Sequence, residues 1–122
     1  MNASCRSFID QIVALSTEMQ TSIRETEEYF SPDEAPITAL FAALGDRIAE
    51  DFDSTDLDVN QQLFRLIEGA MLSGDESLVT AVATGLIEAM VSVAVKKKGL
   101  WKRISLMLGT RSLHHAQAWM TP

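Results

Sequence analysis

Six acidic side chains lie within thirteen residues near the middle of this chain. They are Asp46, Glu50, Asp51, Asp53, Asp56 and Asp58, with one arginine among them. Like charges at this density repel one another, and helix caps alone do not require so many. A basic partner would relieve the repulsion and would be attracted from a distance. We therefore expect these six residues to form a partner-binding surface; an ordinary solvated helix and loop surface is the alternative.

Metal and catalytic chemistry have weaker support. Residues 51–56 resemble a calcium loop but lack its central glycine and its closing bidentate glutamate. His114 and His115 are neighbours, so on a helix they point about 100° apart and cannot chelate one metal as an i, i+4 pair can. We expect them on the surface or at a helix cap. A Ser-His-Asp triad built from distant segments stays open, because triads are defined by geometry. We expect no enzymatic activity, no metal and no cofactor.

One basic run follows in the second half of the chain. It spans Lys96–Arg103 and contains five basic residues and one tryptophan. It is the only candidate for contact with nucleic acid or a membrane surface. Two other assignments remain open for it: a solvated helix end, or an intramolecular counterpart to the acidic half.

Composition and charge favour a single globular domain over residues 1–122. The chain is 47% hydrophobic with a net charge of −7, and folding at this length buries enough surface for a core. Thirteen of the seventeen acids lie in residues 1–60, and seven of the ten Lys and Arg lie in 61–122. Such polarity steers association, whereas the acidic balance argues against nucleic acid as the partner. Cys5 is the only cysteine and cannot form an internal disulfide. With no signal peptide recognised, we expect a cytoplasmic protein.

Apolar residues at spacings of three and four predict helices in the first half. One helix is expected from about Ser4 to just before Tyr29, and two prolines then indicate a loop. Pro36 suits the first turn of a second helix, which extends to Phe52. Asp58 and Gln61 have the spacing of a capping box and predict the start of a third.

The second half predicts a hydrophobic central helix. Gly74 and Asp75 form a stop-and-start signal, and the next helix runs from Glu76 to Lys98 and is apolar on nearly every side. Leu78–Val95 approaches the length of a membrane span, but Glu88 lies deep within it, so we expect a buried core helix and no membrane span.

Short helices should follow the central one, the last from Ser112 to Trp119. Glycines 69 and 85 predict a close approach between the third helix and the central one. The expected fold is all-α: a compact bundle of five to six helices, or stacked αα-hairpins, around the central helix.

Residues 66–88 and the segment Leu108–Ser112, together with Trp119, resemble a small helical bacterial domain found beside polymorphic toxins. The resemblance covers roughly residues 63–119. It implies an immunity protein that binds and neutralises a cognate toxin. The acidic cluster suggests that this toxin is a basic domain. Two alternatives stay open: an effector chaperone or adaptor that holds a segment of a secreted protein, and a regulator that contacts membrane or nucleic acid through Lys96–Arg103.

Overall fold

The structure, a computed structural model, describes residues 1–121, and all regular elements in that range are helical. The elements are α1 Ala3–Val13, α2 Thr17–Phe30, α3 Ile37–Glu50, η1 Phe52–Ser54, α4 Leu57–Met71, α5 Glu76–Thr80, η2 Ala81–Ile87, α6 Glu88–Ala94, α7 Leu100–Ser105 and α8 Thr110–Met120. Because α5, η2 and α6 form one continuous helix, the described chain has seven helices and the short 3-10 turn η1. The predicted all-α bundle is confirmed.

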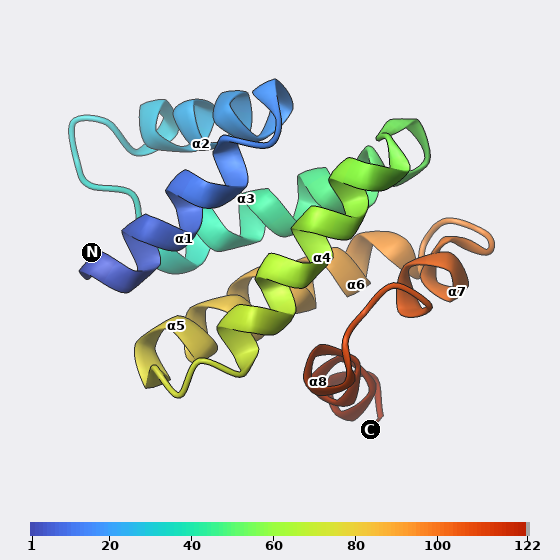
Figure 1. The fold of residues 1–122 in the computed structure, drawn as a ribbon. Helices are drawn as coiled ribbons and strands as arrows, with labels where there is room; N and C mark the ends of the chain where they lie inside the picture. Colours follow the sequence, from blue (N-terminus) through green and yellow to red (C-terminus); the bar gives the residue numbers. More distant parts are fainter. Residues whose placement is uncertain (122) are drawn as a thin grey trace.

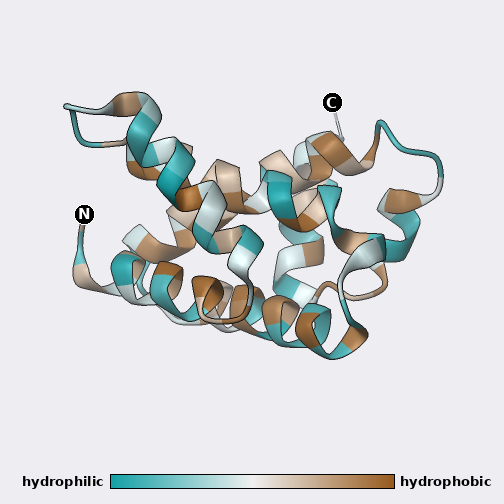
Figure 2. Ribbon diagram, turned by 90° about the horizontal axis from the view of Figure 1, so that it is seen from above, coloured by the Kyte–Doolittle hydropathy of each residue, from teal (hydrophilic) through white to brown (hydrophobic). Residues whose placement is uncertain are grey.

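Two helices form the centre of the bundle. α3 packs along the continuous helix Glu76–Ala94, and α2 covers the other side of α3 (Figure 1). α4 and α8 pack on the continuous helix, and α1 bridges α2, α4 and α5. Phe41 and Leu44 of α3 and Leu86 and Met90 of the continuous helix have no exposed surface. Each helix carries hydrophobic and hydrophilic residues, as amphipathic helices around a shared core do (Figure 2).

The N-terminal helix differs from the expectation, because the chain forms two helices where one is predicted. α1 ends at Val13, and Ser16 begins α2 with its hydroxyl accepting a hydrogen bond from the Met19 backbone N–H at 3.4 Å. A serine that caps the following helix competes with helix continuation. Ile12 and Met19 are both buried, because the turn lets α2 fold back onto the same core.

The predicted capping box of α4 is wrong. Asp56 occupies the N-cap position and makes no side-chain cap hydrogen bond, whereas Asp58 lies in the first helical turn. The stop-and-start signal is confirmed: Gly74 has a φ of +75°, and Asp75 accepts a hydrogen bond from the Leu78 backbone N–H at 3.2 Å.

The central helix is confirmed, although it ends at Ala94 and not at Lys98. The chain then makes a turn that reaches Gly99, whose φ of +78° is left-handed. By length and composition alone this 19-residue helix could cross a membrane, but 56% of its most apolar window is buried inside the bundle. Leu86, at its middle, is wholly buried.

α3 and the central helix cross at a pair of glycines. A Cβ added to Gly85 would lie 2.7 Å from the Phe41 Cβ, and one added to Gly45 would overlap the Leu86 carbonyl oxygen. The predicted close approach therefore exists at Gly85, but its neighbour is α3 and not α4. Gly69, the other glycine predicted there, has no atom within 4 Å of an added Cβ. The crossing lies in η2, where the central helix changes from α-helical to π-helical hydrogen bonding.

We expect Gly45→Ala to destabilise the protein by about 3 kcal/mol, because the added methyl group has no space between two packed backbones. Thermal unfolding followed by circular dichroism measures the effect. Gly69→Ala is the matched control, since the same methyl group enters open space there and should raise the melting temperature. If the two variants changed the melting temperature equally, the close packing of α3 on the central helix at Gly45 would be contradicted.

Candidate functional site

The six predicted acidic residues surround the end of α3 and the connection to α4. Two of them, Asp46 and Glu50, lie on α3. Asp51 and Asp53 lie at η1, and Asp56 and Asp58 lie at the start of α4. Asp46 and Asp51 are half-buried and the others are exposed. Burial raises the pKa of the Asp46 carboxyl, and neighbouring Glu50 raises it further. Burial, the larger cause, removes water from the charged form, whereas Glu50 acts by repulsion between negative charges.

Arg47 lies inside this acidic cluster and pairs with it. Its Nη1 lies 3.4 Å from Glu50 Oε2 and 3.3 Å from Asp51 Oδ1, and its Nε donates a hydrogen bond to Ser22 Oγ of α2 at 3.2 Å. The guanidinium therefore joins α2 to the end of α3. It also neutralises part of the cluster.

A second internal cation comes from the basic run. Arg103 of α7 binds Asp53 with two hydrogen bonds, 3.2 Å from Nε and 2.7 Å from Nη2. Both side chains are about half exposed, so this pair contributes at most about 1 kcal/mol. The intramolecular-counterpart assignment thus holds for Arg103. Across residues 1–121 the four lysines of the run form no ion pair.

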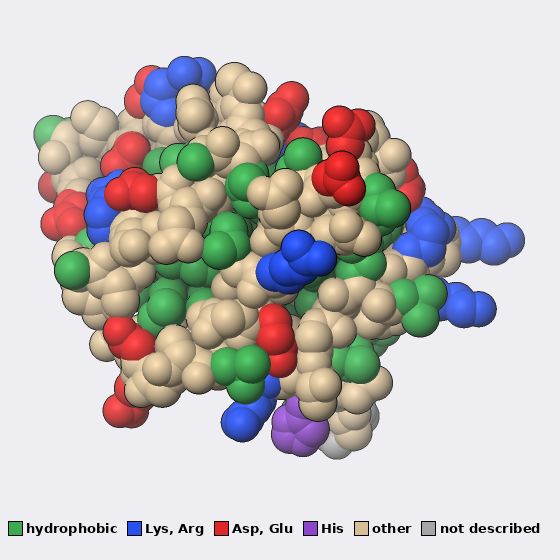
Figure 3. Space-filling model, in the orientation of Figure 1, with side chains coloured by type: hydrophobic (Ala, Val, Ile, Leu, Met, Phe, Trp, Pro, Cys, Tyr) green, Lys and Arg blue, Asp and Glu red, His purple; other side chains and the backbone are tan. Residues whose placement is uncertain are grey.

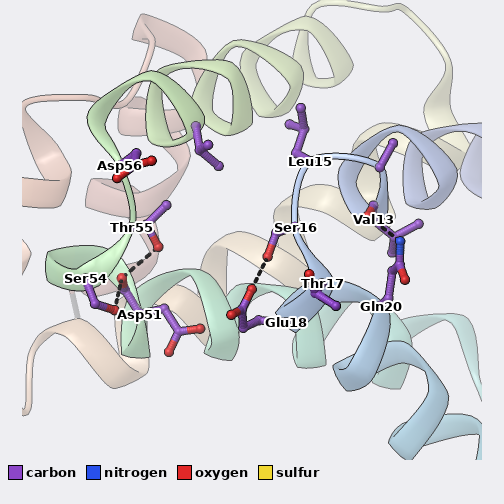
Figure 4. Close-up of a pocket in the computed structure, with 12 residues that line it drawn as sticks. Val13, Leu15, Ser16, Thr17, Glu18, Gln20, Asp51, Ser54, Thr55 and Asp56 are labelled. Atoms are coloured by element: carbon purple, nitrogen blue, oxygen red, sulfur yellow. Dashed lines mark hydrogen bonds between the residues drawn. The ribbon is translucent and has the colours of Figure 1, made fainter.

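A furrow runs beside the cluster between α2 and α3. It consists of three adjoining hollows of about 400, 290 and 330 Å³. The first lies between the α1–α2 turn and the α3–α4 connection, and it shares Thr17 and Glu18 with the second (Figure 4). The second shares Ser22 and Arg47 with the third, which ends at Tyr29. We call this continuous surface the acidic furrow.

Acidic side chains outnumber basic ones in the walls of the acidic furrow. Its only basic side chain is Arg47, and its acidic side chains are Glu18, Glu25, Asp46, Glu50, Asp51 and Asp56. Four of these six belong to the predicted cluster. Asp53 and Asp58 do not line the furrow, and Asp53 is already paired.

Glu18 and Glu25 are the acidic furrow residues that the predicted cluster lacks. They lie on α2 with Ser22, at positions i, i+4 and i+7, which places all three on one face of the helix. That spacing is the sequence signal that could have identified them. The backbone N–H of Glu18 and the Ser16 hydroxyl, 2.9 Å from its carboxylate, lower the Glu18 pKa, so this side chain stays charged.

The histidines differ from one another in their surroundings. His114 is exposed, whereas His115 is half-buried and its Nε2 lies 2.9 Å from Glu88 Oε2 of the central helix. The prediction of a surface or cap position is therefore wrong for His115, which lies half-buried beside Glu88. The nearby Ser112 hydroxyl donates to Glu68 and not to His115. Within residues 1–121 no three His, Cys, Asp or Glu side chains are grouped as metal ligands.

Glu68 of α4 caps α8 from a different helix. One carboxylate oxygen accepts from the Arg111 backbone N–H at 2.9 Å, and the other accepts from the Ser112 backbone N–H at 2.9 Å and its hydroxyl at 2.7 Å. Burial raises the Glu68 pKa, but these hydrogen bonds outweigh it, and the pKa lies below its ordinary value. Because the folded pKa is lowered, this stabilisation is complete above the unfolded pKa and is lost as pH falls through the folded value.

We expect Glu68→Gln to lower the free energy of unfolding by about 1–3 kcal/mol at neutral pH, since it removes the charge from three hydrogen bonds. Urea unfolding at pH 7 and in acid tests this, and the difference from wild type should shrink as pH falls below the Glu68 pKa. Glu27→Gln removes an exposed acid whose side chain forms no ion pair among the described residues. It should change stability little at either pH.

Comparisons with family models, curated proteins and solved structures found no match to this chain.

Proposed function

We propose that this domain is an immunity-type protein that binds a basic toxin domain through the acidic furrow and neutralises it in the cytoplasm. The observation that carries the proposal is the lining of the furrow: six carboxylates and one arginine. The resemblance of residues 63–119 to domains found beside polymorphic toxins adds the inhibitory role. The furrow lies wholly outside those residues, in the part of the chain where a partner-specific surface is expected to vary.

Electrostatics explains why a basic partner suits this surface. The carboxylates lie close together in the free protein, and Glu50 adds by repulsion to the rise that burial causes in the pKa of Asp46. Lysine and arginine side chains entering the furrow would remove that repulsion and form charge-assisted hydrogen bonds. The same charge attracts the partner during diffusion and raises the association rate, most strongly at low salt.

The furrow is also supported by a packed core, which suits an inhibitor that presents a preformed surface. Ile48 and Ala49 of α3, adjacent in sequence to Arg47 and Glu50, are buried. Arg47 joins α3 to α2 through its hydrogen bond to Ser22, and Glu50 and Asp51 hold its guanidinium in place. A preformed surface loses little conformational entropy on binding.

The chaperone alternative requires a different kind of surface. A chaperone that holds an apolar segment needs a hydrophobic groove, whereas the acidic furrow is lined mainly by charged and hydroxyl side chains. The regulator alternative would use the four unpaired lysines of the basic run. Its binding would show a salt dependence that follows those lysines.

The test begins with the protein encoded next to this chain in its genome. Purified in folded form, that protein should bind this domain in isothermal titration calorimetry and lose its toxic activity. A chaperone would instead bind an unfolded or truncated segment and leave activity intact. Binding without inhibition, or no binding by the folded protein, would overturn the immunity proposal.

A further inference from the structure

We propose that two copies of this chain associate through the face formed by α1 and α4, with the two α4 helices crossing at Gly69. This inference does not rest on the proposed function, because the acidic furrow and this face have only Leu15 of the α1–α2 turn in common. The occupant of the face is a second copy of the protein.

Gly69 is the first observation. Each of the other five glycines has an internal reason: two lie at the α3 crossing, two have positive φ, and Gly109 lies against Glu68. Gly69 sits inside α4 with helical φ and open space around it. A glycine at such a position destabilises the helix relative to alanine. Close approach of another backbone is the usual reason for such a residue, and within residues 1–121 nothing approaches it.

The surface around Gly69 is an apolar groove. Two adjoining hollows of about 320 and 380 Å³ lie along α1 and α4 and share Arg65 and Leu66. One basic side chain lies near the centre of this face, with hydrophobic side chains to either side of it and an acidic side chain below it (Figure 3). Leu72, one helical turn after Gly69, is 62% exposed. Leu72 lies beside the groove and lines neither hollow, and the apolar contacts within the groove come from Phe8, Leu66, Ala70 and Leu78.

Charge points to a second copy as the occupant. Each copy carries a net charge of −7, so two copies repel through most of their surface. None of the residues that line the two hollows is acidic, and Arg65 is the only charged one. Like-charged copies can approach most easily through this face.

Helix geometry gives Arg65 a counterpart across the two-fold axis. When two α4 helices cross antiparallel at Gly69, Arg65 of one copy lies opposite Ser73 of the other, about 6 Å along the axis from the crossing. Ser73 follows the C-terminal end of α4, where free carbonyls carry partial negative charge. The last turn of α4 has no basic residue of its own. Arg65 from the second copy supplies that charge, and the symmetric contact forms twice.

Sedimentation velocity of the purified full chain, from about 1 µM to about 1 mM, tests the proposal. Wild type should shift from monomer to dimer across this range. Gly69→Gln should weaken association at least about tenfold, because the side chain holds the helices apart. The same variant should raise the monomer's melting temperature by about 2–4 °C, because glutamine is the better helix former. A merely structural role for Gly69 would not produce these opposite effects.

Two further variants separate the alternatives. Gln61→Ala, on α4 but outside the groove, should leave association unchanged, whereas Leu66→Asp, which lines both hollows, should weaken it as Gly69→Gln does. Wild type that remains monomeric at the highest concentration overturns the proposal. So does a Gly69→Gln protein that dimerises like wild type. If charge reversal of Lys96–Lys98 abolishes association instead, the contact is head-to-tail through the basic run and the α4 crossing is wrong.

Discussion

Leu86→Asp is expected to abolish the cooperatively folded state. Leu86 lies in η2 with no exposed surface, next to the Gly45–Gly85 crossing where α3 and the central helix meet. A carboxylate there has no basic partner in the surrounding core, and an unpaired buried charge costs several kcal/mol. The total stability of a domain this size is only about 5–15 kcal/mol. Circular dichroism should show loss of helix and no sharp thermal transition.

Thr84→Asp provides the matched control for this experiment. Thr84 lies in the same π-helical segment but is exposed, so its aspartate remains in water. The variant loses only the local hydrogen bond from the Thr84 hydroxyl to the Thr80 carbonyl oxygen. It should unfold cooperatively, within a few degrees of wild type. A Leu86→Asp protein that melts like this control would show that Leu86 is not buried.

Charge reversal in the acidic furrow is expected to weaken partner binding by orders of magnitude. We would replace Glu18, Glu25 and Asp56 together with lysine. All three line the furrow, are exposed and form no internal ion pair in the described chain. They are therefore a better choice than Asp51 and Asp53, which pair with arginines. Losing a buried charge-assisted contact costs roughly 2–5 kcal/mol, whereas a rim charge mainly changes the association rate.

Titration calorimetry at low and high salt measures the effect, which should be larger at low salt. The melting temperature should fall by only a few degrees, because the three exposed side chains support no packing, although Glu18 accepts a hydrogen bond from Ser16 and Asp56 lies at the start of α4. The control carries the same charge change away from the furrow, with Asp10, Glu27 and Asp33 replaced by lysine. If this control weakens binding equally, net charge and not the furrow attracts the partner.

A second comparison reverses Lys96, Lys97 and Lys98 to glutamate. These lysines are exposed and unpaired among residues 1–121, so their reversal should hardly affect partner binding. If this variant loses protection against the toxin while the furrow variant keeps it, the binding face is the basic run.

Local sequence patterns were sufficient wherever a signal acts over one or two helical turns. The apolar period of 3.6 residues predicted helices, the lack of a polar face in residues 78–95 predicted a buried central helix, and Gly74 and Asp75 located its start. The same local logic failed at Ser16, where a long apolar period conceals a helix break. It also failed at Asp58, where Asp56 holds the N-cap position instead.

The sequence by itself determined the helical class, the central helix and the acidic character of one region. Only the tertiary structure decided which residues meet: Gly45 with the central helix, Glu68 with the start of α8, and Arg103 with Asp53. Each of these pairs joins segments more than forty positions apart, across distances that no periodicity encodes. The acidic furrow has the same origin. Helix periodicity tells which face of α2 or α3 is polar, but the angle at which they pack decides whether their carboxylates share one hollow.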